Sequence, residues 1–345
     1  MKENILDMKL KKTDISLIIG CINYDFNKCL HLIEGLGNNN NYIKEIICIV
    51  SNVSIEEKVR IESLSSLGEI NIKYYAYTET FLPGKARNIG IKKSNGEYIA
   101  FLDSSTQPPD NWLEVATSII KESIDKKMIL GRTKYYSYSD FEECFIASTY
   151  GKKALYTLPG SLISRSLVNQ LGNFLPSIRS GEDVEWIERA RYFQASIKDE
   201  RMVPLRYGNI EGKGFIELCK KWYKNYSRSG GAELLIYQRQ RYTYIIVASY
   251  IILALAFSWN DNIANWDEAS FWYIPHISKI TVTLLILIYS LLRAIFWPLL
   301  KGVQIFKFSL LNIIRVFFIS LSLDIVKTVA FVKASFFHDK RLSRR

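Results

Sequence analysis

Short apolar runs alternate with amphipathic stretches through the first 230 residues. Runs 15–20 (ISLIIG) and 45–51 (EIICIVS) are rich in β-branched residues and bounded by turn residues, as in buried parallel strands. Residues 27–36 between them carry apolar side chains at helical spacing. The alternation continues with helices predicted at 55–68 and 86–96, the latter ended by Gly96, and strands at 69–77 and 97–103. This order predicts βαβ crossovers and a doubly wound α/β sheet.

A carboxylate stands at the end of the predicted strand 97–103. Asp103 is followed by the hydroxyl residues Ser104, Ser105 and Thr106 and then by a Pro-Pro turn. Because doubly wound sheets bind ligands at the carboxyl ends of their strands, Asp103 is a candidate binding residue. The alternative is a strand-end aspartate that caps the following turn.

The missing motifs argue against a dinucleotide-binding dehydrogenase and a P-loop nucleotide triphosphatase. The chain has no G-x-G-x-x-G after the first strand and no P-loop, H-E-x-x-H or G-x-S-x-G sequence. None of its three histidines, His31, His276 and His338, follows a predicted strand of the sheet. Acid–base chemistry near neutral pH is therefore expected from carboxylates. The five scattered cysteines include no C-x-x-C pair and predict free, buried thiols.

Two stretches of the sequence together indicate a class of enzyme. Residues 83–114 (PGKARNIGIKKSNGEYIAFLDSSTQPPDNWLE) and 158–192 (LPGSLISRSLVNQLGNFLPSIRSGEDVEWIERARY) resemble the family 2 glycosyltransferases in the order and spacing of their motifs. The resemblance extends over roughly residues 14–230. It implies a GT-A fold with a Rossmann-like, mixed doubly wound sheet. It also implies inverting transfer of a sugar from a nucleotide-sugar donor.

The resemblance assigns roles to charged residues on both stretches. Asp183 matches the family's catalytic base, and Glu182 would position it or bind the acceptor. The alternative is an acidic first turn that favours the helix dipole. Arg87 can form bidentate hydrogen bonds with a diphosphate, and the start of its helix offers backbone N–H groups. The resemblance also implies donor contacts from Lys85, Asn88, Asp103 and Ser104.

The expected metal site departs from the family pattern. A divalent ion, Mg²⁺ or Mn²⁺, would bind Asp103, but Ser105 occupies the position where the family's D-x-D motif has its second aspartate. The three possibilities are a metal held largely by substrate, no metal, or an inactive relative. The matching nucleotide positions are Tyr24, Ser51 and Asn52, without the family's proline and acidic pair, and the matching sugar or acceptor positions are Gly160, Ser161 and Trp222.

The last third of the chain predicts a membrane domain. Apolar stretches 242–259 and 279–300 are long enough to span a bilayer, whereas 308–332 contains Arg315, Asp324 and Lys327 and predicts an interfacial helix or a third span. Residues 201–241 carry nine Lys plus Arg against three acids, and 260–278 carry acids without Lys or Arg. The positive-inside rule and the lack of an N-terminal signal-peptide pattern predict a cytosolic catalytic domain at the cytoplasmic membrane.

These patterns predict a GT-A domain over residues 1–235 and a membrane domain over 236–345. The first hypothesis is a membrane-anchored glycosyltransferase that adds a single sugar to a lipid-linked or cell-envelope glycan acceptor. The second is a non-catalytic, sugar-nucleotide-binding scaffold subunit, which Ser105 and the altered nucleotide turns favour. A membrane-tethered nucleic-acid binder has only the net charge of +11 in its favour, since no nucleic-acid motif is present. The expected partners are therefore a nucleotide sugar, the glycan acceptor and membrane lipids.

Overall fold

The computed structural model describes residues 14–64, 71–123, 127–208, 210–227, 258–275 and 277–336. The chain divides into two compact units, which are considered separately. A sheet unit comprises Met1–Tyr136 and Ala154–Asn209, and a helical unit comprises Ser137–Lys153 and Ile210–Arg345.

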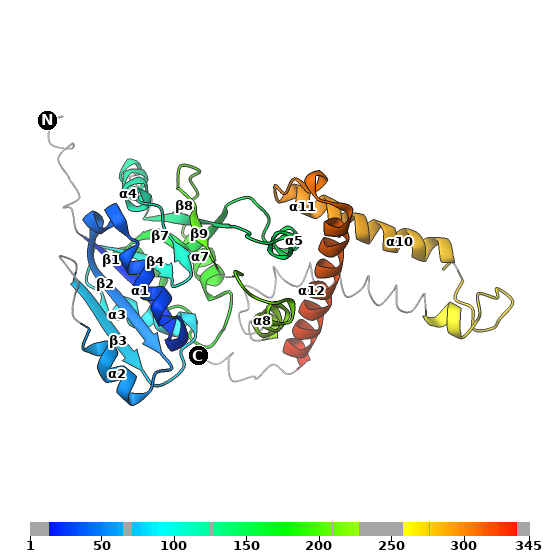
Figure 1. Cartoon of the computed structure of the whole chain (residues 1–345), viewed down its shortest axis with the longest axis horizontal. Helices are drawn as coiled ribbons and strands as arrows, with labels where there is room; N and C mark the ends of the chain where they lie inside the picture. The colour runs from blue at the N-terminus through cyan, green and yellow to red at the C-terminus, as the bar shows by residue number, and fades with distance from the viewer. Residues whose placement is uncertain are drawn as a thin grey trace. The chain divides into compact units, whose positions relative to one another are not determined.

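The sheet unit is built on one mixed sheet (Figure 1). Its described strands follow the order β3-β2-β1-β4-β7-β6-β9-β5, with β8 paired to β6. β3, β2, β1 and β4 are parallel, and the sheet becomes antiparallel where β4 meets β7. The strands are β1 (Ile15–Ile22), β2 (Ile43–Ser51), β3 (Asn71–Tyr77), β4 (Tyr98–Asp103), β5 (Thr106–Gln107), β6 (Met128–Tyr135), β7 (Leu155–Ser164), β8 (Ser196–Ile197) and β9 (Leu205–Tyr207).

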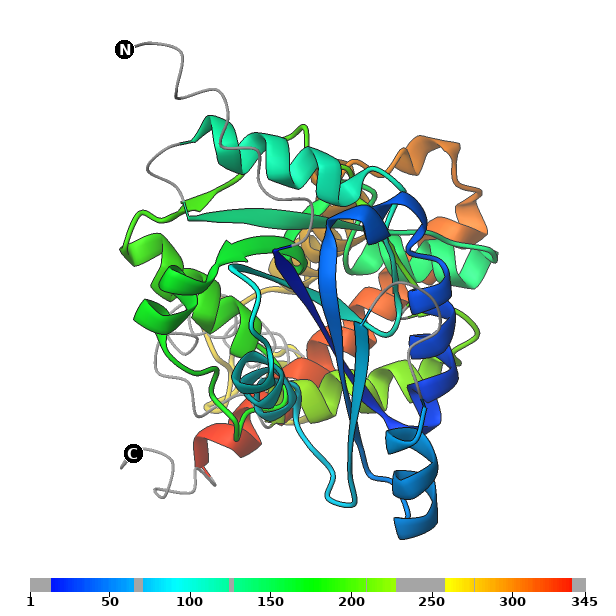
Figure 2. The same ribbon diagram turned by 90° about the vertical axis from the view of Figure 1, so that its left-hand side faces the viewer.

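Helices cover both faces of this sheet (Figure 2). One apolar core lies under α1 (Phe26–Glu34), α2 (Ile55–Glu62) and α4 (Trp112–Glu122). The other lies under α3 (Pro83–Lys93), α6 (Arg165–Leu171) and α7 (Glu182–Tyr192). The 3₁₀ turns η1 (Asn23–Asp25) and η2 (Gly37–Tyr42) follow β1 and α1. The buried central strands carry continuous apolar runs because helices cover both of their faces.

The predicted doubly wound α/β sheet is confirmed, with small shifts at the element ends. The four predicted strands correspond to β1, β2, β3 and β4, and the predicted helices to α1, α2 and α3. The expected role of Gly96 as a helix terminator is wrong, because α3 ends at Lys93. The Gly96 backbone N–H instead donates to the Ser16 hydroxyl at 2.7 Å, which fixes the entry to β4 beside β1.

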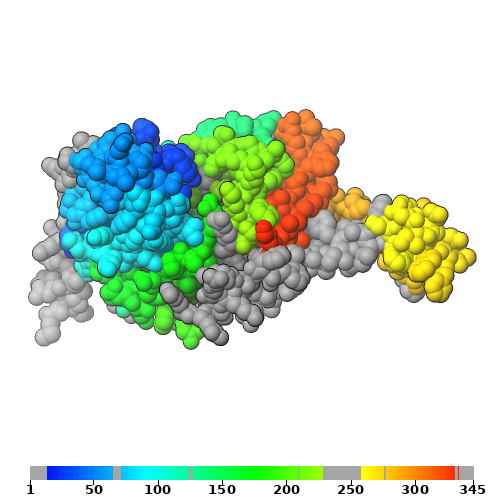
Figure 3. All heavy atoms as spheres, turned by 90° about the horizontal axis from the view of Figure 1, so that it is seen from below, coloured from blue at the N-terminus to red at the C-terminus, as the bar shows by residue number. Residues whose placement is uncertain are grey.

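The helical unit joins two segments that are distant in sequence. Figure 3 shows α8 (Phe215–Ser227) against α12 (Leu310–Phe336), and α5 (Asp140–Ser148) also packs on α12. The Ser148 hydroxyl donates to the Val316 carbonyl at 3.2 Å. The unit boundaries therefore differ from a division at residue 235, since α5 and α8 bury apolar surface on the C-terminal helix. The remaining described elements are α10 (Lys279–Leu291), η3 (Leu292–Phe296), α11 (Trp297–Leu300) and η4 (Ile305–Lys307).

Among the described helices, only the continuous segment Lys279–Leu300 is long and apolar enough to cross a membrane. The expected span at 242–259 lies outside the described residues apart from its last two. The stretch expected at 308–332 is helical, as α12, and its Asp324 is fully buried. Arg293 donates two hydrogen bonds to the Asp324 carboxylate, at 2.7 and 3.0 Å. Protein contacts in the helical unit therefore neutralise the charge of Asp324.

Candidate active site

The carboxyl ends of three parallel strands meet at one edge of the sheet. Gly20 of β1 pairs with Asp103 of β4, and Ile22 pairs with Ser51 of β2. Tyr24 follows β1 directly and its side chain is exposed. The strand register thus brings the donor-side positions predicted from the sequence to the edge where doubly wound sheets bind ligands.

A buried arginine links two of the predicted acidic residues. Arg87 of α3 donates from Nη1 to Glu182 Oε1 at 2.7 Å and from Nη2 to Asp103 Oδ1 at 3.1 Å. Burial lowers the pKa of Arg87, but the charges of Asp103 and Glu182 outweigh burial and hold it above its ordinary value. In this structure the guanidinium bridges two carboxylates, so its first role is to neutralise them and to join α3, β4 and α7.

Close packing brings α3 and α7 to this bridge. Gly84 approaches the loop before α7 so closely that an added Cβ would lie 2.4 Å from the Leu175 carbonyl oxygen. Asn88 forms two hydrogen bonds with the Phe174 backbone, donating to its carbonyl at 2.9 Å and accepting from its N–H at 2.8 Å. Both ends of the Asn88 amide therefore hold the loop before α7.

An aromatic cluster fixes the start of α7 beside the end of β4. Phe174 stacks on Trp186 with ring centroids 4.6 Å apart, and Phe101 meets both rings edge to face. Gly181 precedes α7 with φ of 93°, a left-handed conformation that favours glycine. The turn at Gly181 allows Glu182 to begin the helix facing Arg87.

The two adjacent acids have different surroundings. Glu182 is 4% exposed, and its Oε2 has no hydrogen-bond partner among the described residues. Burial and the charge of Asp183 raise the pKa of Glu182 to about 7, although Arg87 opposes the increase. Asp183 is only partly buried and accepts a hydrogen bond from the Val184 N–H at 2.9 Å. Of the two, Asp183 is the carboxylate that an incoming hydroxyl group can reach from solvent.

The raised pKa of Glu182 predicts a pH-dependent stability. The folded chain keeps this proton up to about pH 7, whereas an unperturbed glutamate releases it near 4.5. Between these pH values the folded state binds more protons, so the Glu182 contribution to the free energy of unfolding falls as pH rises, by about 2–3 kcal/mol. Urea unfolding of the detergent-solubilised chain between pH 5 and 8 should show a decline that Glu182→Gln lacks. Parallel curves for both proteins would contradict the assignment.

The loop after β4 is held from several sides. The Thr106 hydroxyl donates to the Asp103 carbonyl at 2.7 Å, and the Gly208 N–H donates to the Ser105 carbonyl at 2.9 Å. The Tyr207 hydroxyl donates to Asp103 Oδ2 at 3.0 Å. Tyr207 was not predicted from the sequence, because it pairs with Thr106 across 100 intervening residues and no local motif marks it.

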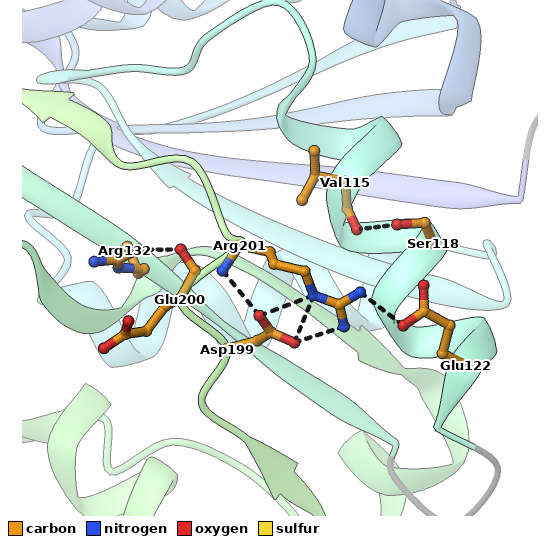
Figure 4. Close-up of polar contacts among 7 residues, drawn as sticks. All are labelled: Val115, Ser118, Glu122, Arg132, Asp199, Glu200 and Arg201. Carbon is orange, nitrogen blue, oxygen red and sulfur yellow. Dashed lines mark hydrogen bonds and ion pairs between the residues drawn. The ribbon is translucent and has the colours of Figure 1, made fainter.

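Basic residues fix the segment that leads to Tyr207 (Figure 4). Arg132 of β6 donates to the backbone carbonyls of Glu200 and Met202. Arg201 forms ion pairs with Asp199 at 2.7 Å and with Glu122 of α4 at 2.7 Å. The Arg132 contacts tie the turn before β9 to β6, whereas the Arg201 pairs lie at the exposed surface.

The donor set at Asp103 bears on the expected divalent metal. No group of three or more His, Cys, Asp or Glu that could hold a metal ion occurs in the described part of the chain. Each oxygen of Asp103 accepts one of the two hydrogen bonds described above, and a carboxylate oxygen has two lone pairs. This arrangement fits a hard cation that brings most of its oxygen ligands with it. It does not fit an ion held by protein side chains alone.

The other predicted donor residues lie outside the bridge. Ser51 is buried and its hydroxyl donates to the Cys21 carbonyl at 3.4 Å, while Asn52 has φ of 63° and accepts from the Thr80 hydroxyl at 3.0 Å. Lys85 pairs with Glu79 at 2.7 Å. Ser104 is partly buried in the loop after Asp103. Of these, Ser104 alone adjoins the bridge in sequence.

The three predicted sugar or acceptor positions divide between the units. Gly160 and Ser161 belong to β7, where the Gly160 carbonyl accepts from the Trp112 indole and the fully buried Ser161 hydroxyl donates to the Thr157 carbonyl. Their observed bonds thus lie within the sheet unit. Trp222 belongs to α8 of the helical unit, where its ring lies 6.0 Å from that of Tyr150 and 4.6 Å from the Lys327 ammonium.

Comparison with known proteins identifies the class. Residues 16–146 match the model of the glycosyl transferase family 2. The chain is 26% identical over 220 residues to the glycosyltransferase AglE of Haloferax volcanii, covering 61% of this chain and 71% of the relative. It is 28% identical over 193 residues to an uncharacterized glycosyltransferase of Rickettsia bellii, covering 53% of this chain and 27% of that protein. The chain is a glycosyltransferase, with a region similar to the glycosyl transferase family 2 at residues 16–146.

The solved structures are less similar to this chain in sequence than the two relatives above. The mannosyltransferase PcManGT of Pyrobaculum calidifontis, in complex with GDP-Man and Mn²⁺, has 14% identity and a TM-score of 0.49, covering 90% of this chain and 87% of its own. S. aureus TarS 1–349, in complex with UDP-GlcNAc, has 16% identity and a TM-score of 0.43, covering 90% of this chain and 91% of its own. The expected mixed sheet of the GT-A fold is confirmed by the strand order and the family match.

Proposed function

We propose that the chain is an inverting glycosyltransferase that moves a single sugar from a nucleotide-sugar donor to a lipid-linked or cell-envelope glycan acceptor. The observation that carries this proposal is the Arg87 bridge between Asp103 and Glu182, with Asp183 beside it, at the carboxyl edge of the sheet. The bridge joins the motifs of both stretches that resemble the family. An isolated acidic helix start would have no such partner on another helix.

Asp183 is the proposed base. The acceptor hydroxyl gives its proton to the Asp183 carboxylate while its oxygen forms a bond with the anomeric carbon. The bond from that carbon to the diphosphate oxygen breaks on the opposite face, and the electron pair leaves with the nucleoside diphosphate. Glu182, bound to Arg87, holds the first turn of α7 so that Asp183 faces the acceptor. A positioned base of this kind contributes about 10²–10⁴-fold to the rate.

The charge of the site supports binding of the donor together with a divalent metal. Of Arg87, Asp103, Glu182 and Asp183, three are acids and one is a cation already bound to two of them. A diphosphate is also negative, so its binding here without a cation is electrostatically unfavourable. When bound, Mg²⁺ or Mn²⁺ would neutralise charge on the leaving diphosphate. Asp103 would hold the metal through its remaining lone pairs, with Ser105, at the position of the family's second aspartate, as the second proposed protein ligand.

The second half of the proposal concerns the membrane. Lys279–Leu300 is apolar and 22 residues long, which supports a membrane anchor. The basic composition of residues 201–241 supports a cytosolic sheet unit at the cytoplasmic membrane. An anchored transferase has its active site near the bilayer, which favours a lipid-linked acceptor. Tyr24, Ser51 and Asn52 remain the proposed contacts for the nucleoside, and Trp222 for the acceptor.

The test is hydrolysis and transfer with a panel of nucleotide sugars, using the purified full-length protein with and without Mn²⁺ and membrane lipid extract. Turnover of one donor that is lost in Asp103→Ala supports the proposal and identifies the donor. Donor binding without turnover, even with lipid extract, would instead support the non-catalytic scaffold that Ser105 suggests.

A further inference from the structure

We propose that Tyr207 is a positioning residue for the donor diphosphate and its metal, acting through Asp103. The inference rests on the proposed function, because it concerns the same site. It adds a residue from β9, beyond both stretches that resemble the family.

The position of Tyr207 is set by backbone as well as side-chain contacts. Tyr207 pairs with Thr106 in the antiparallel β5–β9 ladder, and the next residue, Gly208, donates to the Ser105 carbonyl at 2.9 Å. The Tyr207 ring meets the Tyr135 ring edge to face with centroids 5.2 Å apart. β9 therefore lies along the loop in which serine replaces the expected second acid.

The Asp103 carboxylate is oriented from two directions. Arg87 donates to Oδ1 at 3.1 Å and Tyr207 donates to Oδ2 at 3.0 Å, while the side chain of Asp103 remains 30% exposed. Two donors on different oxygens fix the carboxylate plane, and the exposed lone pairs remain for an incoming cation. Asp103 is the one carboxylate at the positions of the expected D-x-D motif, and the fold restricts its orientation.

A fixed carboxylate matters more when it is the only charged protein ligand. With two acids, one can rotate while the other holds the metal, but Asp103 has no such partner because position 105 is a serine. Hydrogen-bond donors behind ligating side chains typically contribute 10–100-fold to metal affinity or activity. Tyr207, rather than a second acid, would then hold the Asp103 carboxylate in the orientation that metal binding requires.

The test measures Mn²⁺ binding directly. Free Mn²⁺ is followed by electron paramagnetic resonance while the full-length protein is titrated with UDP or GDP present. Tyr207→Phe keeps the ring and removes the hydroxyl, so it should raise the Mn²⁺ dissociation constant by about 10–100-fold. Tyr98→Phe, which removes a phenol at the opposite end of β4, is the matched control and should bind as wild type does.

A double-mutant cycle separates positioning from a merely structural effect. In an Asp103→Ala background, Tyr207→Phe should cause no further loss of Mn²⁺ affinity, since the two residues act as one unit. Tyr207→His, which retains a donor, should recover part of the affinity and covers the case in which the phenylalanine variant fails to fold. Unchanged Mn²⁺ affinity in Tyr207→Phe, or additive losses in the cycle, would overturn the inference. Failure of wild type to turn over any donor would count against the proposed function, while the binding titration still tests Tyr207.

Discussion

Replacing Arg87 with methionine is expected to abolish sugar transfer and to lower the free energy of unfolding by about 3–5 kcal/mol. The substitution keeps the length of the apolar stem but leaves Glu182 and Asp103 without their shared cation. Glu182 is buried, so without Arg87 its ionised form would lack both water and a partner. Urea unfolding of the detergent-solubilised chain measures the change in stability, and donor turnover measures the loss of transfer.

Two further variants make the Arg87 prediction specific. Adding Glu182→Gln to Arg87→Met removes one of the stranded charges and should recover part of the stability while leaving transfer absent. Arg201→Met also removes an arginine bound by two acids, but that arginine is 54% exposed, and little change is expected in either measurement (Figure 4). A stable, active Arg87→Met protein would show that the bridge is dispensable.

The parts of this fold that follow from the sequence are those with a local pattern. β1, β2 and β4 are short apolar runs between turn residues, the pattern of parallel strands that are buried on both faces. The sequence predicts that Asp103 and Glu182 are site residues, because Asp103 ends a predicted strand and Glu182 begins a predicted helix. Each also lies in a motif that resembles those of the family. The sequence does not predict their common partner: Arg87 is expected to face phosphate, whereas in the structure it donates to both acids. The helix that carries it packs closely on Leu175 at Gly84.

The remaining features depend on contacts between distant parts of the chain. β9 has three residues, too few for a periodic pattern, and it exists because it pairs with β5 and β6. Likewise, α8 has an amphipathic sequence whose partner, α12, lies some 90 residues later, so no boundary pattern assigns it to the helical unit. Long-range pairing of this kind leaves no signal at the residues themselves, and Tyr207 was missed for that reason.

Replacing Asp183 with asparagine is expected to reduce the rate of sugar transfer by about 10²–10⁴-fold. Asparagine has nearly the same shape, and its side-chain oxygen can still accept the Val184 N–H bond, but its amide cannot take the acceptor's proton. Because Asp183 is partly exposed and the Arg87 bridge runs through Glu182, the unfolding midpoint and donor affinity should stay close to wild type. Single-turnover transfer with saturating donor measures the chemical step, and donor titration measures binding.

The position of the base within α7 can be tested on the same helix. Glu188→Gln removes a carboxylate about one and a half turns beyond Asp183, where it pairs with Arg191 near the helix end, and should leave transfer unchanged. Glu182→Gln gives a second comparison, since it alters the bridge but leaves Asp183 in place, and its transfer rate should exceed that of Asp183→Asn. If the order of these two rates is reversed, Glu182 is the base, a role that its pKa of about 7 would suit.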